Sequence, residues 1–374
     1  MNPRTIRLLV VLGCVSCSLA LMGQPEPGTA PAPADAIGSL RNAKVAHAIK
    51  PGEKVQLTFL AGELTTEQKA ELTKVAPGVR IVSGLTRQTA MEHAAEADGI
   101  DGRFATPEFI QKAPKLVWVQ SMSAGVDRYL GNKALMDEDR IVLTNMRAVH
   151  GPAIADHAMA MLLTLTRDLR FYEKAQAAGK WTDESPQVRP VALQGRTMLV
   201  VGIGGIGAEI AQRAHGFGMK VIATRRSDAP APAYVERVGK PEDLVKMLPE
   251  ADVVAICVPL TTETAGMMNA AAFSAMKPGA YLINIARGRI VDTDAMVKAL
   301  ESGRLAGACL DVTDPEPLPE GHPLWRQKNV VITPHVAAEA DLTETRHWEL
   351  FRENMRRFGA GEPLLNCVDK KAGY

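Results

Sequence analysis

Three residues in the second half of the chain have side chains that could together reduce a carbonyl group: Arg287, Glu316 and His335. A 2-keto acid presents a carboxylate and a carbonyl side by side, and the planar guanidinium of Arg287 can pair with the first and polarise the second. Hydride delivered to the carbonyl carbon leaves an alkoxide, which a histidine such as His335 can protonate near neutral pH. A carboxylate such as that of Glu316, hydrogen-bonded to the imidazole, would fix its tautomer and favour its charged form.

Taken singly, each of the three has a simpler interpretation. Arg287 could be a solvated arginine after a strand, Glu316 one charge in a proline-rich acidic loop, and His335 a satisfied histidine at a strand end. The same loop also holds Asp314 and Glu320, so the choice of Glu316 depends on alignment spacing more than on chemistry.

A glycine turn lies upstream, where Val200 to Gly207 reads Val-Val-Gly-Ile-Gly-Gly-Ile-Gly. The spacing fits a dinucleotide-binding turn that permits a tight bend, close approach of backbone to a pyrophosphate, and packing of helix on strand. The run 197–201 predicts a buried strand and the run 208–217 a helix, whose N-terminus would offer free N–H groups to the phosphates. The alternative is a glycine-rich turn without a ligand. The predicted cofactor residues here are Gly202, Gly204, Gly205, Ile206 and Gly207.

The next predicted strand, 219–224, ends in Thr224-Arg225-Arg226. A cofactor without a 2′-phosphate would favour Asp or Glu at this point, because a carboxylate accepts from the ribose hydroxyl. Two guanidinium groups can instead hold a 2′-phosphate through charge-assisted hydrogen bonds. The sequence therefore favours NADP(H), and NAD(H) remains the alternative if Arg225 and Arg226 are ordinary surface charges.

From about Val55 to its C-terminus the chain resembles the D-isomer-specific 2-hydroxyacid dehydrogenases, which include glyoxylate/hydroxypyruvate reductases and phosphoglycerate dehydrogenases. The resemblance rests on motifs in the family's order: Ser123-Ala-Gly-Val-Asp127, Ile154-Ala-Asp-His157, the glycine turn, Cys257-Val-Pro-Leu260, Met276-Lys-Pro-Gly-Ala280, Asn284-Ile-Ala-Arg-Gly-Arg-Ile-Val-Asp292, Gly307-Ala-Cys-Leu-Asp-Val312, Glu316-Pro-Leu-Pro319, Thr333-Pro-His335 and Gly361-Glu-Pro-Leu-Leu-Asn366. It implies that Arg287 binds substrate, that His335 is the acid/base and that Glu316 is its acidic partner.

The resemblance also implies further contacts. The backbone N–H groups of Ser123, Ala124 and Gly125 would form a nest for the substrate carboxylate, and Asp311 would contact the nicotinamide carboxamide; the alternatives are a simple turn and a capping residue. Val258, Pro259 and Ala286 are the remaining cofactor-binding residues that it implies. A homodimer is expected from the resemblance alone. Asp156, where many relatives have Glu, and Ala338, where many have Gly, depart from the pattern and weaken any transfer of substrate identity.

Strand and helix signals alternate along the chain, which predicts parallel sheets. With the resemblance, they predict an α/β fold of two doubly wound parallel-sheet domains, a Rossmann NAD(P)-binding domain inserted in a flavodoxin-like substrate domain. The expected parts are the substrate domain at 51–146, the dinucleotide-binding domain at 147–336, and a C-terminal helix and tail at 337–374 that complete the substrate domain. A long apolar helix from Pro152 to about Ala178 would join them, and a helix over about 343–358 would return to the first domain.

The first 23 residues have the layout of a secretory signal peptide, with Arg4 and Arg7 before an apolar run, and a Pro/Ala-rich linker follows at 24–50. This layout predicts export, either to a periplasm or as a protein anchored by a lipid on Cys14 or Cys17. The alternative is a cytoplasmic protein translated from Met22. The apolar run is too short and too interrupted to predict a stable membrane span.

Composition excludes other classes of protein. The net charge is +1 and the basic residues are scattered among acids, which argues against a nucleic-acid-binding or membrane-surface protein. The five cysteines show neither a disulfide framework nor metal-ligand spacing, so no metal is expected. Cys257 and Cys309 fall in apolar runs and are interpreted as small buried hydrophobes.

These observations predict an oxidoreductase that reduces a small 2-keto acid, such as glyoxylate or hydroxypyruvate, to its D-2-hydroxy acid. One rival is a dinucleotide-sensing binding protein on the same scaffold. A second is a relative that oxidises formate or phosphite. Turnover of a 2-keto acid would separate the three.

Overall fold

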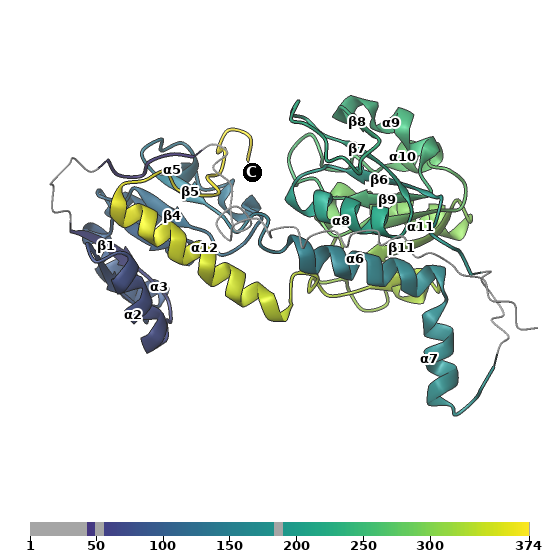
Figure 1. Cartoon of the computed structure of the whole chain (residues 1–374), viewed down its shortest axis with the longest axis horizontal. Coiled ribbons are helices and arrows are strands. Elements are labelled where there is room, and N and C mark those ends of the chain that lie inside the picture. Colours follow the sequence, from purple (N-terminus) through teal and green to yellow (C-terminus); the bar gives the residue numbers. More distant parts are fainter. Residues whose placement is uncertain (1–42, 49–55, 183–189, 374) are drawn as a thin grey trace, which may run out of the picture. The chain divides into compact units, whose positions relative to one another are not determined.

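The computed structural model describes residues 43–48, 56–182 and 190–373. These residues form two parallel sheets, each covered by helices (Figure 1). One sheet has five strands and the other has seven, and every strand pair within them is parallel. The predicted fold class is confirmed. The expected signal peptide at 1–23 and most of the expected linker at 24–50 lie outside the described residues.

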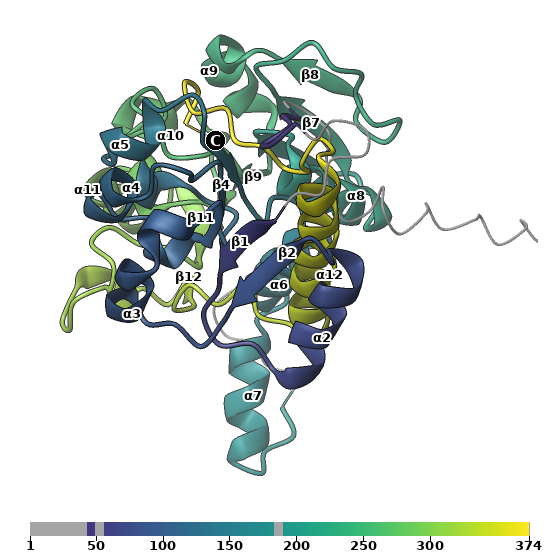
Figure 2. The ribbon, with the colours of Figure 1, turned by 90° about the vertical axis from the view of Figure 1, so that its left-hand side faces the viewer.

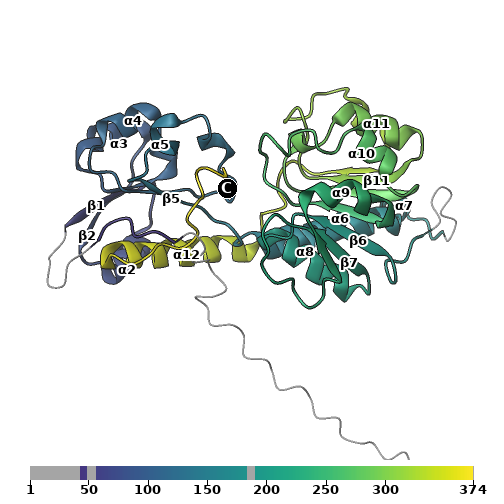
Figure 3. The same ribbon diagram turned by 90° about the horizontal axis from the view of Figure 1, so that it is seen from above.

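The first sheet has the strand order β2-β1-β3-β4-β5, the order of flavodoxin-like folds. Its strands are β1 (Leu57–Leu60), β2 (Val79–Val82), β3 (Gly99–Asp101), β4 (Trp118–Gln120) and β5 (Val142–Thr144). Figure 3 shows α2 (Thr66–Val75) and α12 (Asp341–Ala360) on one face, with α3 (Arg87–Glu92), α4 (Pro107–Lys112) and α5 (Lys133–Met136) on the other. Side-chain caps begin all of these helices except α12: for example, the Thr65 hydroxyl accepts from the Gln68 N–H before α2, and Thr106 caps α4.

Helix α12 completes the core of the first sheet although it comes last in the chain. Figure 2 shows it beside α2 and the strands of that sheet. Trp118 is fully buried, and its ring lies 4.9 Å from that of Phe358 on α12 and 5.0 Å from that of Phe59 on β1. The tail after α12 then pairs with β5 through an antiparallel bridge between Cys367 and Thr144.

The second sheet has the order β12-β11-β10-β9-β6-β7-β8: the chain runs from β6 outward to β8, then crosses back to β9 on the other side of β6, as in Rossmann folds. Its strands are β6 (Thr197–Val201), β7 (Lys220–Thr224), β8 (Arg237–Gly239), β9 (Val253–Ile256), β10 (Ala280–Asn284), β11 (Leu305–Leu310) and β12 (Val330–Ile332). Helices α6 (Gly151–Thr166) and α8 (Gly205–Gly216) cover one face; α9 (Leu244–Met247), α10 (Ala270–Ala275) and α11 (Thr293–Glu301) cover the other.

The sequence-based elements differ from the structure in two places. The single helix expected from Pro152 to Ala178 is two helices, α6 and α7 (Leu169–Ala177), because Asp168 has φ +51° and its left-handed backbone ends the run. Aspartate tolerates this conformation better than most residues. The strand β3 and the helix α4 have no clear sequence signal. They are three and six residues long, and β3 contains glycine and aspartate, which are poor strand formers.

A pair of histidines, His150 buried and His347 half-buried, joins the start of α6 to α12. The Nε2 atoms of His150 and His347 lie 2.7 Å apart, so one imidazole donates to the other. His150 is 8% exposed, and burial, followed by the neighbouring imidazole, lowers its pKa to about 4. Burial also lowers the pKa of His347. Both rings are therefore neutral near pH 7, which suits a hydrogen bond between two imidazoles.

No helix in the described part of the chain is both long and apolar enough to span a bilayer. Over the same residues no three His, Cys, Asp or Glu side chains gather as a metal site would require. Burial raises the pKa of Cys257 to about 12, which keeps this thiol protonated and unreactive.

Candidate active site

The glycine turn adopts a bend that side chains would block. Gly202 has φ +96°, and a Cβ on it would lie 2.6 Å from Val258 Cγ1. A Cβ on Gly207 would lie 2.2 Å from the Gly202 carbonyl oxygen, which shows how closely α8 packs on the turn. Gly204 differs, because the nearest atom to its Cβ position is Arg147 Nη2 at 3.8 Å. The open side of the turn is therefore at Gly204.

The turn fits the diphosphate of a dinucleotide. Helix α8 begins at Gly205, and the N–H groups of Gly205 and Ile206 have no backbone acceptor within the described chain. Such N–H groups at the positive end of a helix bind phosphate oxygens. Val258, which packs on Gly202, and Pro259, whose carbonyl accepts from Thr264 Oγ1 at 2.6 Å, lie on the loop after β9 beside the turn.

The two arginines after β7 differ in what they contact. Thr224 is buried and its hydroxyl accepts from the Gly202 N–H at 3.2 Å, so this residue fixes the turn. Arg225 donates from Nε to the Ser227 carbonyl and from Nη1 to the Pro230 carbonyl, which folds its guanidinium onto its own loop. Arg226 is exposed. The Thr261 hydrogen bond and, less strongly, the Arg226 charge lower the pKa of Glu263, so Arg226 acts on another charged side chain near this strand end.

Arg287 follows β10 and meets the loop after β4. Its Nη2 and Nε donate to Asp127 Oδ1 at 2.9 and 3.2 Å, and its Nη1 donates to the Ala286 carbonyl at 2.7 Å. Asn284 fixes the turn that carries it, donating to the Arg287 carbonyl and accepting from the Ala286 N–H. A Cβ on Gly125 would lie 2.0 Å from Arg287 Nη2. The structure therefore brings Arg287 and the expected substrate loop together.

Hydrogen bonds to its carbonyl groups hold the expected substrate loop, Ser123 to Gly125. Asn145 donates from Nδ2 to the Ala124 carbonyl at 2.8 Å, and the Met146 N–H donates to the Ser123 carbonyl at 3.1 Å. The N–H groups of Ala124 and Gly125 have no acceptor among residues 43–48, 56–182 and 190–373. These donors, next to a guanidinium, could bind a small carboxylate.

His335 and Glu316 form a pair. The imidazole Nδ1 lies 2.7 Å from Glu316 Oε1, and the side chains are 46% and 42% exposed. The other carboxylate oxygen accepts from the Thr313 N–H at 3.4 Å. With Nδ1 committed to Glu316, Nε2 is the nitrogen that can face a substrate. No hydrogen bond or ion pair within the described chain joins His335 to Arg287.

Asp311 holds the loop that carries His335. It is 3% exposed, and its Oδ1 accepts from Thr333 Oγ1 at 2.6 Å and the Val336 N–H at 3.0 Å. Its Oδ2 accepts from the Ala337 N–H, and its carbonyl accepts from the His335 N–H at 2.8 Å. His335 has φ +58°, a conformation that a histidine keeps only when its surroundings impose it.

Comparison with known proteins decides the family. The model for "D-isomer specific 2-hydroxyacid dehydrogenase, NAD binding domain" matches residues 159–337. The glyoxylate reductase of Korarchaeum cryptofilum is 34% identical over 294 residues, which is 76% of this chain and 87% of that protein. The glyoxylate/hydroxypyruvate reductase B of Salmonella agona is 33% identical over 300 residues, 78% of this chain and 91% of that protein. The chain belongs to the D-isomer-specific 2-hydroxyacid dehydrogenase family.

A solved member of the D-isomer-specific 2-hydroxyacid dehydrogenase family agrees. The enzyme from Xanthobacter autotrophicus Py2, in complex with NADPH and MES, has a TM-score of 0.71 and 31% identity, over 84% of this chain and 99% of that one. The resemblance stated from the motifs is confirmed. The present protein is therefore a dehydrogenase, an oxidoreductase that uses NAD(P) and interconverts 2-keto and 2-hydroxy acids.

Sequence reasoning gave no role to several residues of this dehydrogenase. Asp127, the partner of Arg287, belongs to a quoted motif, but it is 160 positions away in sequence and no spacing rule links the two. Lys240 donates to the Arg226 carbonyl at 3.2 Å from the end of β8, and nothing in the local sequence marks it. Thr333 links His157 to Asp311, with His157 Nε2 2.9 Å from Thr333 Oγ1.

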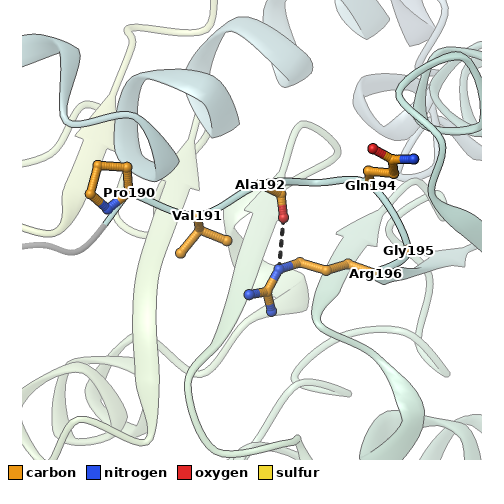
Figure 4. A pocket seen from close by; sticks show the side chains of 6 residues that line it. All are labelled: Pro190, Val191, Ala192, Gln194, Gly195 and Arg196. Atoms are coloured by element: carbon orange, nitrogen blue, oxygen red, sulfur yellow. Dashed lines mark hydrogen bonds between the residues drawn. The ribbon is translucent and has the colours of Figure 1, made fainter.

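A hollow of about 510 Å³ is lined by residues of the segment 190–196, which precedes β6 (Figure 4). Figure 4 shows Arg196 donating from Nε to the Ala192 carbonyl, a distance of 2.9 Å. None of the residues expected to bind cofactor or substrate lines this hollow. The hollow therefore adds no residue to the candidate site at the glycine turn, Arg287 and His335.

Proposed function

We propose that this dehydrogenase reduces a small 2-keto acid, of the glyoxylate or hydroxypyruvate kind, to the D-2-hydroxy acid with NADPH as the preferred reductant. The observation that carries the proposal is the His335–Glu316 pair, which leaves one imidazole nitrogen for the substrate carbonyl. Two relatives named for glyoxylate or hydroxypyruvate reduction support the substrate class. The bound nicotinamide supplies the hydride.

Proton transfer falls to His335. Glu316 accepts from Nδ1 and so fixes which nitrogen carries the transferable proton. The negative carboxylate also stabilises the imidazolium before it donates to the alkoxide. Asp311 holds the backbone of His335 through its carbonyl and the following turn through its carboxylate. We expect these contacts to keep the imidazole aligned during turnover, whether or not Asp311 also contacts the nicotinamide.

Substrate binding falls to Arg287 and the loop at Ser123, Ala124 and Gly125. The guanidinium can pair with the substrate carboxylate while the free N–H groups of Ala124 and Gly125 donate to the same group. Asp127 already accepts two hydrogen bonds from Arg287, so it orients the guanidinium; one N–H on Nη1, beside the one that the Ala286 carbonyl accepts, and one on Nη2 remain for substrate. Because Gly125 lies against Nη2, a larger residue there would displace the guanidinium.

The preference for NADPH rests on the end of β7. Thr224 contacts the glycine turn, and no carboxylate stands at that strand end to accept from a ribose hydroxyl. Arg226 is exposed, and Lys240 donates to its carbonyl while pairing with Asp228, so two positive charges and one negative charge lie near this strand end. The Xanthobacter autotrophicus relative, which binds NADPH, supports the same preference.

The test is the oxidation of NADPH and of NADH by the purified protein with glyoxylate, hydroxypyruvate and a bulkier 2-keto acid. General acid catalysis contributes about 100- to 10,000-fold, so His335→Gln should lose that much of kcat. His93→Gln is the matched control, because His93 is a surface histidine paired with Glu96. Arg226→Gln should lower kcat/KM with NADPH about 10- to 100-fold and leave NADH unchanged.

The rivals predict other results. A dinucleotide sensor would bind NADPH and turn over no keto acid. A relative that oxidises formate or phosphite would reduce NAD(P)+ with those compounds and leave the keto acids untouched. Either result would replace the proposed reduction.

A further inference from the structure

The glycine turn has no charge of its own with which to hold a diphosphate. Residues 200–207 are valine, glycine and isoleucine only. The helix end contributes about half an elementary charge, and the exposed N–H groups add hydrogen bonds. A diphosphate carries two negative charges, so a cation from another part of the chain would complete its binding site.

Arg147 supplies a guanidinium at that point. Its Nη2 lies 3.8 Å from the position that a Cβ on Gly204 would take, on the open side of the turn. It comes from the segment between β5 and α6, outside the second sheet. Glu209, on the helix that follows the turn, is paired with Arg213 at 2.6 Å.

The backbone around Arg147 is held in place. Its N–H donates to Asn145 Oδ1 at 3.1 Å, and its carbonyl accepts from Asn366 Nδ2 at 2.8 Å. The next residue, Ala148, has φ +70° and lies against Gly205, whose Cβ position is 3.2 Å from the Ala148 Cβ. The glycine at 205 therefore allows the segment that carries Arg147 to approach the turn.

We propose that Arg147 binds the diphosphate of the cofactor. The proposal rests on the proposed function, because it requires that the turn binds a nicotinamide dinucleotide. A planar guanidinium can donate two parallel hydrogen bonds to phosphate oxygens, which a lysine cannot do. The diphosphate is common to NADPH and NADH, so Arg147 strengthens both equally. Arg226, by contrast, acts only on the cofactor with a 2′-phosphate.

The test is calorimetric binding of NADPH, NADH and ADP-ribose to the purified full chain, without keto acid. Arg147→Gln should weaken all three about 10- to 100-fold, and Arg147→Lys should weaken them less. Arg237→Gln is the matched control, since Arg237 is a surface arginine paired with Glu250, and it should change none of them. Arg226→Gln should weaken only NADPH.

Unchanged affinity of Arg147→Gln for all three ligands would overturn the inference, and so would a loss confined to NADPH. Melting curves without ligand identify a variant that fails to fold, in which case Arg147→Lys decides between the same outcomes. If the unaltered protein binds none of the three ligands, the proposed function fails and the role of Arg147 fails with it. Binding by the unaltered protein together with no effect at Arg147 refutes the role of Arg147 alone.

Discussion

Acidification should destabilise this dehydrogenase through His150. Burial beside His347 lowers its pKa to about 4 in the folded protein, against 6.5 in the unfolded chain. Between those two values the unfolded state binds a proton that the folded state does not. The free energy of unfolding therefore falls as pH falls from about 6.5 to about 4, and His150 makes no pH-dependent contribution above that window.

The magnitude follows from the same two values. Each pKa unit is worth about 1.4 kcal/mol, so the full effect is roughly 3 kcal/mol at pH 4 and about 2 kcal/mol at pH 5. The hydrogen bond between the two histidines also explains why the free energy of unfolding falls with pH. A protonated His150 could no longer accept from His347 and would place a charge in a buried contact. Glu344 is the charged group that opposes this effect at His347, where it favours the protonated form.

The perturbation is His150→Gln, which keeps a polar side chain but cannot take up a proton. Urea unfolding followed by circular dichroism at pH 7.5, 6.5, 5.5 and 5.0 gives the assay. The variant should be less stable than the unaltered protein at pH 7.5, and the difference should narrow by about 2 kcal/mol at pH 5. His93→Gln controls for a surface histidine. Equal pH dependence in the unaltered protein and His150→Gln would refute the reasoning.

Three further outcomes are expected. Gly207→Ala should weaken NADPH binding at least 10-fold, because its Cβ would meet the Gly202 carbonyl at 2.2 Å; Gly216→Ala, which meets nothing within 4 Å, should bind as before, and calorimetry compares the two. Glu316→Gln should lower kcat about 10- to 100-fold by removing the charged acceptor at His335, and an unchanged steady-state rate would contradict this. Asp311→Asn should lower kcat by a similar factor and reduce thermal stability. The cause is that an amide would turn a donor toward Thr333 or toward the N–H groups from which Asp311 now accepts. A variant with unchanged kcat and unchanged melting temperature would show that the loop does not need the carboxylate.

The local chemistry of the site was predictable from sequence, and the long-range contacts were not. The glycine turn has a spacing that fixes its backbone, so Gly202, Gly204 and Gly207 could be assigned a conformation from residue types alone. Glu316 was one of three acids in its loop, and only coordinates show that its carboxylate is the one on the His335 imidazole. Asp127 contacts Arg287 across 160 positions, a pairing that depends on how the chain folds back.

Arg225 and Arg226 are a second case in which residue type alone does not predict the contacts of a side chain. The two residues are adjacent and of the same type, so residue type and spacing predict one role for both. The structure folds Arg225 onto the Ser227 and Pro230 carbonyls because the loop after β7 turns back on itself. The break at Asp168 has a similar cause, since one left-handed residue ends a helix whose apolar pattern continues past it.

The position of α12 has a consequence for synthesis on the ribosome. The strands of the first sheet emerge early, but the ring of Phe358 that covers Trp118 is made only after the whole second sheet. Until then Trp118 and Phe59 lack part of the packing that covers them. The last strand of the second sheet, by contrast, ends at Ile332. The first part of the chain to be translated should therefore be the last to acquire its native core, which reverses the usual order of domain folding. A released chain truncated near residue 337 should then protect the second sheet from protease and leave the first sheet open to cleavage.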